Sequence, residues 1–159
     1  MSVLAWLTFL VLVGFYFHEV LQEQRNPNRD PESRVGEGGA TEVVLLRNKY
    51  GHYVTQGEIN GRSVVFMLDT GATGVAVPLH VAQRLGLQRG RPVTTQTANG
   101  QATAFLTTLD SVSVGEIEIR DVSASISPGL QMDEILLGMS FLRHIEFTQR
   151  GRTLVLRQY

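Results

Sequence analysis

Alternating apolar and polar residues from Thr41 onwards constrain the fold of this chain more than any other feature. The alternation recurs in short runs, among them Val112-x-Val114, Ile117-x-Ile119 and Val122-x-Ala124-x-Ile126. Such a period of two is typical of strands that bury one face. Turn signals separate the runs, and one of them, Asn60-Gly61, favours a two-residue hairpin. The pattern therefore predicts an all-β domain, a closed or nearly closed β-barrel with one or two short helices.

The first 24 residues do not follow this pattern. Residues 3–17 contain no charged side chain, and the apolar span from Ser2 to Leu21 reaches the roughly 20 residues that a helix needs to cross a bilayer core. We predict that residues 1–24 form a single transmembrane anchor. A cleaved signal peptide is the chief alternative, although a positively charged start and an Ala-x-Ala cleavage site are both missing.

Residues 25–40 differ from both neighbours in composition. They contain two prolines, three glycines and one sizeable apolar residue, Val35. This composition predicts a flexible linker, because such a segment buries too little apolar surface to offset its conformational entropy. The remaining residues, 41–159, are enough for one domain with a modest core and too few for two.

Charge and cysteine content exclude several classes of function. The net charge is −1, from 14 basic and 15 acidic residues, and neither sign forms a block, so we expect no nucleic-acid partner. The chain has no cysteine, which excludes thiol catalysis and thiolate metal sites. Its four histidines occur singly. We therefore expect neither a metal nor a cofactor.

The tetrapeptide Asp69-Thr70-Gly71-Ala72 is the strongest candidate for a catalytic motif. It follows directly on the apolar run of residues 63–68. A carboxylate at the end of a buried strand, close to a glycine, lies on a tight turn where a second backbone or a substrate can approach closely. The same residues also make an ordinary strand exit, in which the Asp and Thr side chains cap the turn's own amides.

Three further segments accompany this motif. A short apolar strand covers residues 73–77, and a short helix is predicted between Pro78 and Gly86. A polar hairpin over residues 93–104 is centred on Asn99-Gly100, and is either an ordinary surface hairpin or a mobile lid. Much later comes the apolar run Leu136-Leu137-Gly138.

The order of these segments, with Asp69-Thr70-Gly71-Ala72 first and Leu136-Leu137-Gly138 last, resembles the retropepsin-like aspartic proteases, in a bacterial, membrane-anchored form. The resemblance implies a retropepsin-like barrel in which Asp69 is catalytic. It further implies a supporting role in the active site for Thr70, Gly71, Ala72, Leu136, Leu137 and Gly138. The hairpin would be the flap that covers the substrate, with Thr97, Ala98, Asn99 and Gly100 at its tip.

Aspartic proteases activate water between two carboxylates that share a proton. The chain has one Asp-Thr-Gly, and its other acidic residues lack that motif. If it is an enzyme of this class, a homodimer must bring two copies of Asp69 to its twofold axis to hydrolyse a protein or peptide substrate. The alternative is a non-catalytic, membrane-tethered binding module with the same barrel. The resemblance also implies a location in the inner (cytoplasmic) membrane, with the protease domain on the periplasmic side.

Overall fold

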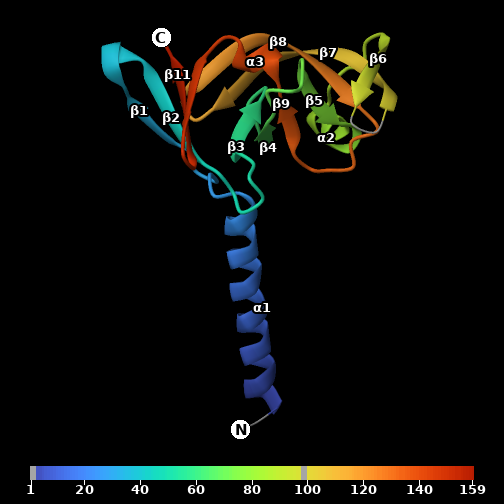
Figure 1. Cartoon of the computed structure of the whole chain (residues 1–159). Helices are drawn as coiled ribbons and strands as arrows, with labels where there is room; N and C mark the ends of the chain where they lie inside the picture. Colours follow the sequence, from blue (N-terminus) through green and yellow to red (C-terminus); the bar gives the residue numbers. More distant parts are fainter. Residues whose placement is uncertain (1–2, 98–99) are drawn as a thin grey trace.

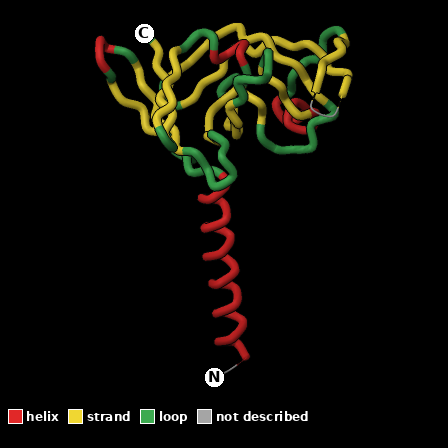
Figure 2. The backbone as a smooth tube through the Cα atoms, in the orientation of Figure 1, coloured by secondary structure: helices red, strands yellow, loops and turns green. Residues whose placement is uncertain are grey.

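The computed structural model describes residues 3–97 and 100–159, and shows one long helix that carries a mostly β body (Figure 1). The helix is α1 (Val3–Arg25). Figure 2 shows that strands and loops make up nearly all of the body, with only short helices among them. This mostly β architecture with few helices confirms the predicted fold class.

The remaining elements follow in chain order. The strands are β1 (Glu32–Val35), β2 (Thr41–Leu46), β3 (Val54–Ile59), β4 (Arg62–Leu68), β5 (Val75–Pro78), β6 (Pro92–Thr97), β7 (Gly100–Val114), β8 (Ile117–Ser127), β9 (Ile135–Leu137), β10 (Glu146–Arg150) and β11 (Thr153–Gln158). The short helices are the 3-10 turn η1 (Glu37–Gly39), α2 (Leu79–Leu85) and α3 (Met139–Leu142).

A closed barrel forms the centre of the body. The larger sheet has the strand order β3-β4-β9-β5-β8-β7-β6, and β3 also pairs with β7 through Glu58↔Ser113 and Ile59↔Val112. This second pairing closes the sheet on itself and leaves β6 outside, paired only with β7. Closure removes the exposed edges of the six barrel strands, which would otherwise pair with other chains, while β6 remains an edge strand.

Strand β9 lies between β4 and β5, although it is distant from both in the sequence. It runs parallel to β4, with Leu68 opposite Leu137, and antiparallel to β5, with Ala76 opposite Leu136. The strands β4 and β5 are joined by the turn that contains Asp69. This insertion therefore brings the end of β9 directly beneath that turn.

A smaller sheet of four strands, in the order β1-β2-β11-β10, lies beside the barrel (Figure 1). All of its pairings are antiparallel. The two sheets share one core, because buried apolar side chains of β2 and β11 belong to the same cluster as those of the barrel strands. Its largest fully buried side chains are Phe66, Phe141, Leu45, Ile59, Leu109, Ile117, Ile126, Ile135, Leu137, Leu142, Leu156 and Val43.

The helix α1 is separate from this core. It is long and apolar enough to cross a membrane, with a mean hydropathy of 1.8 over the best window and none of that window buried. Its side chains include many exposed apolar residues, such as Leu4, Phe9 and Phe15. A helix apolar on all sides and uncovered by protein needs another apolar environment.

The structure differs from the expectation of a flexible linker between α1 and β2. Strand β1 pairs with β2 from Glu32↔Val44 to Val35↔Thr41, and Asn26 and Asn28 are buried. Polar side chains, and not apolar ones, hold this segment in place: the amide of Asn28 hydrogen-bonds to backbone groups of β2 and β3.

Two hairpins were predicted from Asn-Gly pairs. At Asn60-Gly61 the φ angles of 51° and 72° and the pairing of Ile59 with Arg62 confirm the prediction. In the second hairpin Thr97 pairs with Gly100. Ala98 and Asn99 of the predicted flap, and with them the expected turn at Asn99-Gly100, lie outside the described residues.

Candidate active site

Asp69 lies on the turn that follows β4, and three hydrogen bonds hold it there. Its backbone N–H donates to the carbonyl oxygen of Leu137 over 3.2 Å, and its own carbonyl accepts from the N–H of Ala72, also over 3.2 Å. The carboxylate oxygen Oδ1 accepts from the N–H of Gly71 at 2.9 Å. The carboxylate is thus oriented by the backbone of its own turn, half-buried at the edge of the barrel.

Gly138 allows the closest backbone approach in this region. A Cβ atom built on Gly138 would lie 2.2 Å from the carbonyl oxygen of Gly74 and 2.6 Å from that of Ala72. Side chains do not tolerate such distances to backbone atoms, so only glycine fits here. The neighbouring Met139 N–H donates to the carbonyl oxygen of Ala72 at 2.9 Å. The end of β9 is therefore bound tightly against the Asp69 turn.

The residues predicted to support the site fall into two groups. Thr70 and Gly71 are exposed on the turn, while Ala72 is half-buried beneath it. Leu137 and Gly138 are buried, and Leu136 is half-buried in β9. The structure thus brings together the two sequence motifs, 69–72 and 136–138, which are more than sixty residues apart.

Ser140 is a structural residue of the site that sequence reasoning missed. Its hydroxyl accepts from the N–H of Val75 at 3.0 Å and donates to the carbonyl oxygen of Ser123 at 2.7 Å. The side chain is buried, with a relative exposure of 7%. It ties α3 to the start of β5 and to β8, and so braces the strand that leaves the Asp69 turn. No local sequence signal distinguishes this serine from a surface one.

The predicted flap is a hairpin of β6 and β7 that projects from the barrel (Figure 1). At its described end the Thr97 hydroxyl donates to the carbonyl oxygen of Gly100 over 2.7 Å. Gly100 has a φ of 106°, which side-chain-bearing residues rarely adopt. Most β6 side chains are exposed, so the hairpin has little attachment to the core.

The comparisons with known proteins agree with this geometry. The family model described as "gag-polyprotein putative aspartyl protease" matches residues 55–144, which include both motifs. A crystal structure of a retropepsin-like aspartic protease from Rickettsia conorii superimposes with a TM-score of 0.64 and 31% identity. The match covers 81% of this chain and 96% of that one. The chain belongs to the retropepsin-like aspartic protease family.

Two curated relatives are also similar to this retropepsin-like chain. An uncharacterised protein of a Sinorhizobium species is 36% identical over 114 residues, which cover 70% of this chain and 49% of the relative. An uncharacterised protein of Rickettsia prowazekii (strain Madrid E) is 31% identical over 121 residues, which cover 74% of this chain and 52% of the relative. The chain thus spans about half the length of the curated relatives it matches.

This retropepsin-like domain holds one copy of the Asp-Thr-Gly turn. Within the described part of the chain, no hydrogen bond or ion pair links Asp69 to another carboxyl group. Asp133 instead pairs with His80 at 2.9 Å, and both side chains are exposed. In residues 3–97 and 100–159, no group of three or more histidine, aspartate and glutamate side chains could hold a metal ion.

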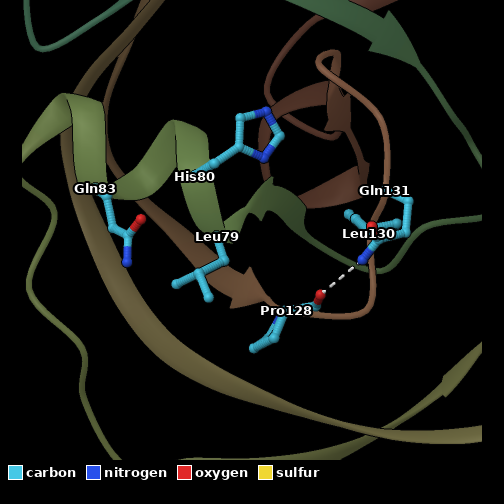
Figure 3. Close-up of a pocket in the computed structure, with 6 residues that line it drawn as sticks. All are labelled: Leu79, His80, Gln83, Pro128, Leu130 and Gln131. Atoms are coloured by element: carbon cyan, nitrogen blue, oxygen red, sulfur yellow. Dashed lines mark hydrogen bonds between the residues drawn. The ribbon is translucent and has the colours of Figure 1, made fainter.

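A pocket of about 270 Å³ lies between α2 and the loop after β8 (Figure 3). Its lining consists of Leu79, His80, Gln83, Pro128, Leu130 and Gln131. Because Pro78 pairs with Ser127, this pocket lies at the end of β5 that is remote from the Asp69 turn. It is a separate surface feature from the Asp69 site.

Proposed function

We propose that the chain is an aspartic endopeptidase that hydrolyses peptide bonds with two Asp69 carboxylates, one from each subunit of a homodimer. One observation carries this proposal. Asp69 is presented on an exposed turn, and within the described residues Gly71 is the one donor to its carboxylate. A single carboxylate in this position is half of an aspartic dyad, and a second copy of the chain can supply the other half.

The chemistry follows from placing two such carboxylates together. Two like charges about 3 Å apart cannot both ionise, so the pair shares one proton. The ionised carboxylate accepts a proton from a bound water as that water attacks the peptide carbonyl carbon, and the protonated one donates to the carbonyl oxygen. The C–N bond of the resulting intermediate then breaks: the nitrogen takes the proton from the first carboxylate, and a hydroxyl of the intermediate returns one to the second. Thr70 and Gly71, exposed on the same turn, would lie against the partner's copies. The residues 136–138 would support the turn from below.

The β6–β7 hairpin is proposed as the flap. A hairpin that projects from the barrel with mostly exposed side chains can close over an extended peptide and exclude water from the dyad. The proposed flap residues are Thr97, Ala98, Asn99 and Gly100.

The proposal includes a location. Residues 1–24 would anchor the chain in the inner membrane of a bacterium, and residues 41–159 would act on the periplasmic side. The apolar, uncovered surface of α1 supports the anchor. Part of the segment 25–40 is bound to the barrel, so in this proposal it holds the domain close to the anchor.

The test is hydrolysis of a denatured protein mixture by the full-length chain, from acidic to neutral pH, with and without a statine-type inhibitor. Asp69→Asn should lower the rate by about 10²–10⁴-fold or more, because an amide can neither accept the water's proton nor share one. Thermal unfolding should be unchanged. A matched control is Asp133→Asn, whose side chain is 96% exposed. It should leave the rate unchanged.

Two results would contradict the proposal. If folded Asp69→Asn protein cleaved at the wild-type rate, Asp69 would not be catalytic. If folded wild-type protein bound peptides without cleaving them at any pH, the chain would be the non-catalytic binding module of the alternative hypothesis.

A further inference from the structure

We infer that the β2–β3 turn, residues 47–52, is a second membrane contact that rests on the lipid headgroups beside α1. The inference rests on the proposed role of α1 as a membrane anchor and is independent of the proposed catalysis. It concerns how the domain is held on the bilayer.

The β2–β3 turn is bound directly to the last turn of α1. The Asn48 side-chain amide donates to the carbonyl oxygen of Arg25 at 2.9 Å, and the Lys49 ammonium donates to Gln24 Oε1 at 2.7 Å. Figure 1 shows this loop beside the upper end of the helix. The first bond also satisfies one of the carbonyl groups that every helix leaves unpaired at its C-terminus.

Asn28 fixes the chain just after the helix to the two strands that flank this turn. Its side-chain amide donates to the carbonyl oxygens of Leu46, at 2.9 Å, and of Val54, at 2.6 Å. Its side-chain oxygen accepts from the N–H of Leu46 at 2.7 Å. Asn28 is 5% exposed, so these are buried bonds, which are costly to break. The helix and the β2–β3 turn therefore form one joint, with no free tether between them.

The height of this joint above the apolar span matches the headgroup layer. The apolar span ends at Leu21, and the four residues from there to Arg25 rise about 6 Å along a helix. The polar layer on each side of a bilayer core is roughly 5–7 Å thick. The contacts of the turn with Gln24 and Arg25 thus place it at headgroup level.

The side chains of the turn suit that layer. Tyr50 is 60% exposed, and its ring lies 5.0 Å from the ammonium group of Lys49. A tyrosine ring is stable at the membrane interface, where its body meets apolar groups and its hydroxyl meets water. Lysine is attracted to anionic phosphate groups.

The charges near the joint also favour an anionic surface. The cationic residues are Arg25, Arg29, Arg47 and Lys49, and the acidic ones are Glu19, Glu23 and Asp30. Glu19 is already paired with Arg29. The β2–β3 turn itself carries no acidic residue. Its partner is therefore the headgroup layer of the bilayer that holds α1, with a preference for anionic lipids.

The test uses the full-length chain in vesicles of phosphatidylcholine, with and without phosphatidylglycerol. The chain has no cysteine, so His52→Cys attaches a fluorophore to the turn alone, and Val35→Cys attaches it to the β1–β2 hairpin as a control. Val35 is 82% exposed, and its hairpin points away from α1 (Figure 1). The single tryptophan, Trp6 in α1, reports insertion of the helix.

We expect a nitroxide on the lipid headgroup to quench the label at position 52 several-fold more strongly than the label at position 35. The difference should grow with phosphatidylglycerol and shrink when Lys49→Gln and Tyr50→Ser are added to His52→Cys. A nitroxide on the acyl chain should quench Trp6 in the same vesicles.

Equal quenching at positions 52 and 35 while Trp6 is quenched would overturn the inference. Absence of Trp6 quenching would overturn it as well, by removing α1 from the bilayer. Neither result depends on hydrolysis.

Discussion

Gly138 shows how one missing side chain determines the geometry of the candidate site. A methyl group at this position would lie within 2.6 Å of two backbone carbonyl oxygens, those of Gly74 and Ala72. The Ala72 oxygen cannot move away without losing its hydrogen bond from the Met139 N–H. A glycine here is what allows β9 to lie between β4 and β5.

We therefore expect Gly138→Ala to destabilise the domain by about 1–3 kcal/mol or more, as for other overpacked sites, and to displace the Asp69 turn. The measurement is the free energy of unfolding in urea, together with hydrolysis. Gly129→Ala is the control, because a Cβ there would meet no heavy atom within 4 Å. If both variants had the same stability, the close approach at Gly138 would not be a real constraint.

Glu42 in β2 is a second residue on which local structure depends. Its side chain is 4% exposed and pairs with Arg157, through Nε at 2.8 Å, and with Arg34 at 2.9 Å. The hydrogen bonds from Arg157 and then Arg34 lower the pKa of Glu42 below its ordinary value of 4.5. A Cβ on Gly36 would lie 2.4 Å from the Glu42 carboxyl carbon, so the chain after β1 covers this ion pair.

Because the folded-state pKa of Glu42 is lowered, its contribution to stability is complete above the ordinary pKa and is lost as the pH falls through the folded-state pKa. We expect the free energy of unfolding of the wild type to decrease below about pH 4.5. Glu42→Gln should be less stable at neutral pH and should lose less stability on acidification. Denaturant titrations at several pH values measure this. The control is Glu58→Gln, at an exposed position of β3, which should retain the wild-type pH dependence of the free energy of unfolding. If Glu42→Gln also retained that dependence, Glu42 would not be its source.

At the scale of elements, a substitution in the β6–β7 hairpin is expected to lower activity with little effect on stability. Gly100 has a φ of 106°, and a Cβ there would meet no heavy atom within 4 Å. A side chain at this position would therefore strain the backbone without a clash, at a cost of about 1–3 kcal/mol. In a hairpin with little attachment to the core, that strain distorts the flap more than it unfolds the barrel.

We expect Gly100→Val to lower kcat/KM for peptide hydrolysis while the thermal unfolding temperature changes little. Gly61→Val is the matched control, because Gly61 also has a positive φ, 72°, and open space around it, but lies in the β3–β4 hairpin. That variant should lose stability and keep its activity per folded molecule. If the two variants had equal effects on activity, the β6–β7 hairpin would be an ordinary surface hairpin and not a flap.

At the scale of the whole molecule, the proposed dimer and the anchor depend on each other. Two domains held on one membrane face share a thin layer, which raises their effective concentration above that of free chains. The joint at Asn28 also restricts how far each domain can turn relative to its helix. A weak interface between the two Asp69 turns is then sufficient.

We expect specific activity to rise with surface density when the full-length chain is reconstituted at increasing protein-to-lipid ratios. The reason is that two chains must meet before a dyad exists. Crosslinking in the same vesicles should follow the activity. Constant specific activity down to the most dilute vesicles, with no crosslinked pairs, would overturn the shared-site mechanism.

Several properties of this protein follow from the sequence alone. The alternation after Thr41 predicts the strands, Asn60-Gly61 predicts its hairpin, and the apolar start predicts a long helix, all of which the structure contains. Each depends on residues adjacent in the chain, whose side-chain period and backbone preferences are readable locally. The two motifs, taken in order, also identified the family.

Only the tertiary structure determined how these parts are connected. The insertion of β9 between β4 and β5, the pairing of β3 with β7 and the bonds of Ser140 all join residues far apart in the sequence. The binding of Asn28 to β2 and β3 is of the same kind, and for this reason composition predicted a free linker where the structure has a joint. A polar side chain shows what it can donate or accept, but its partner depends on which backbone groups the fold leaves unpaired beside it.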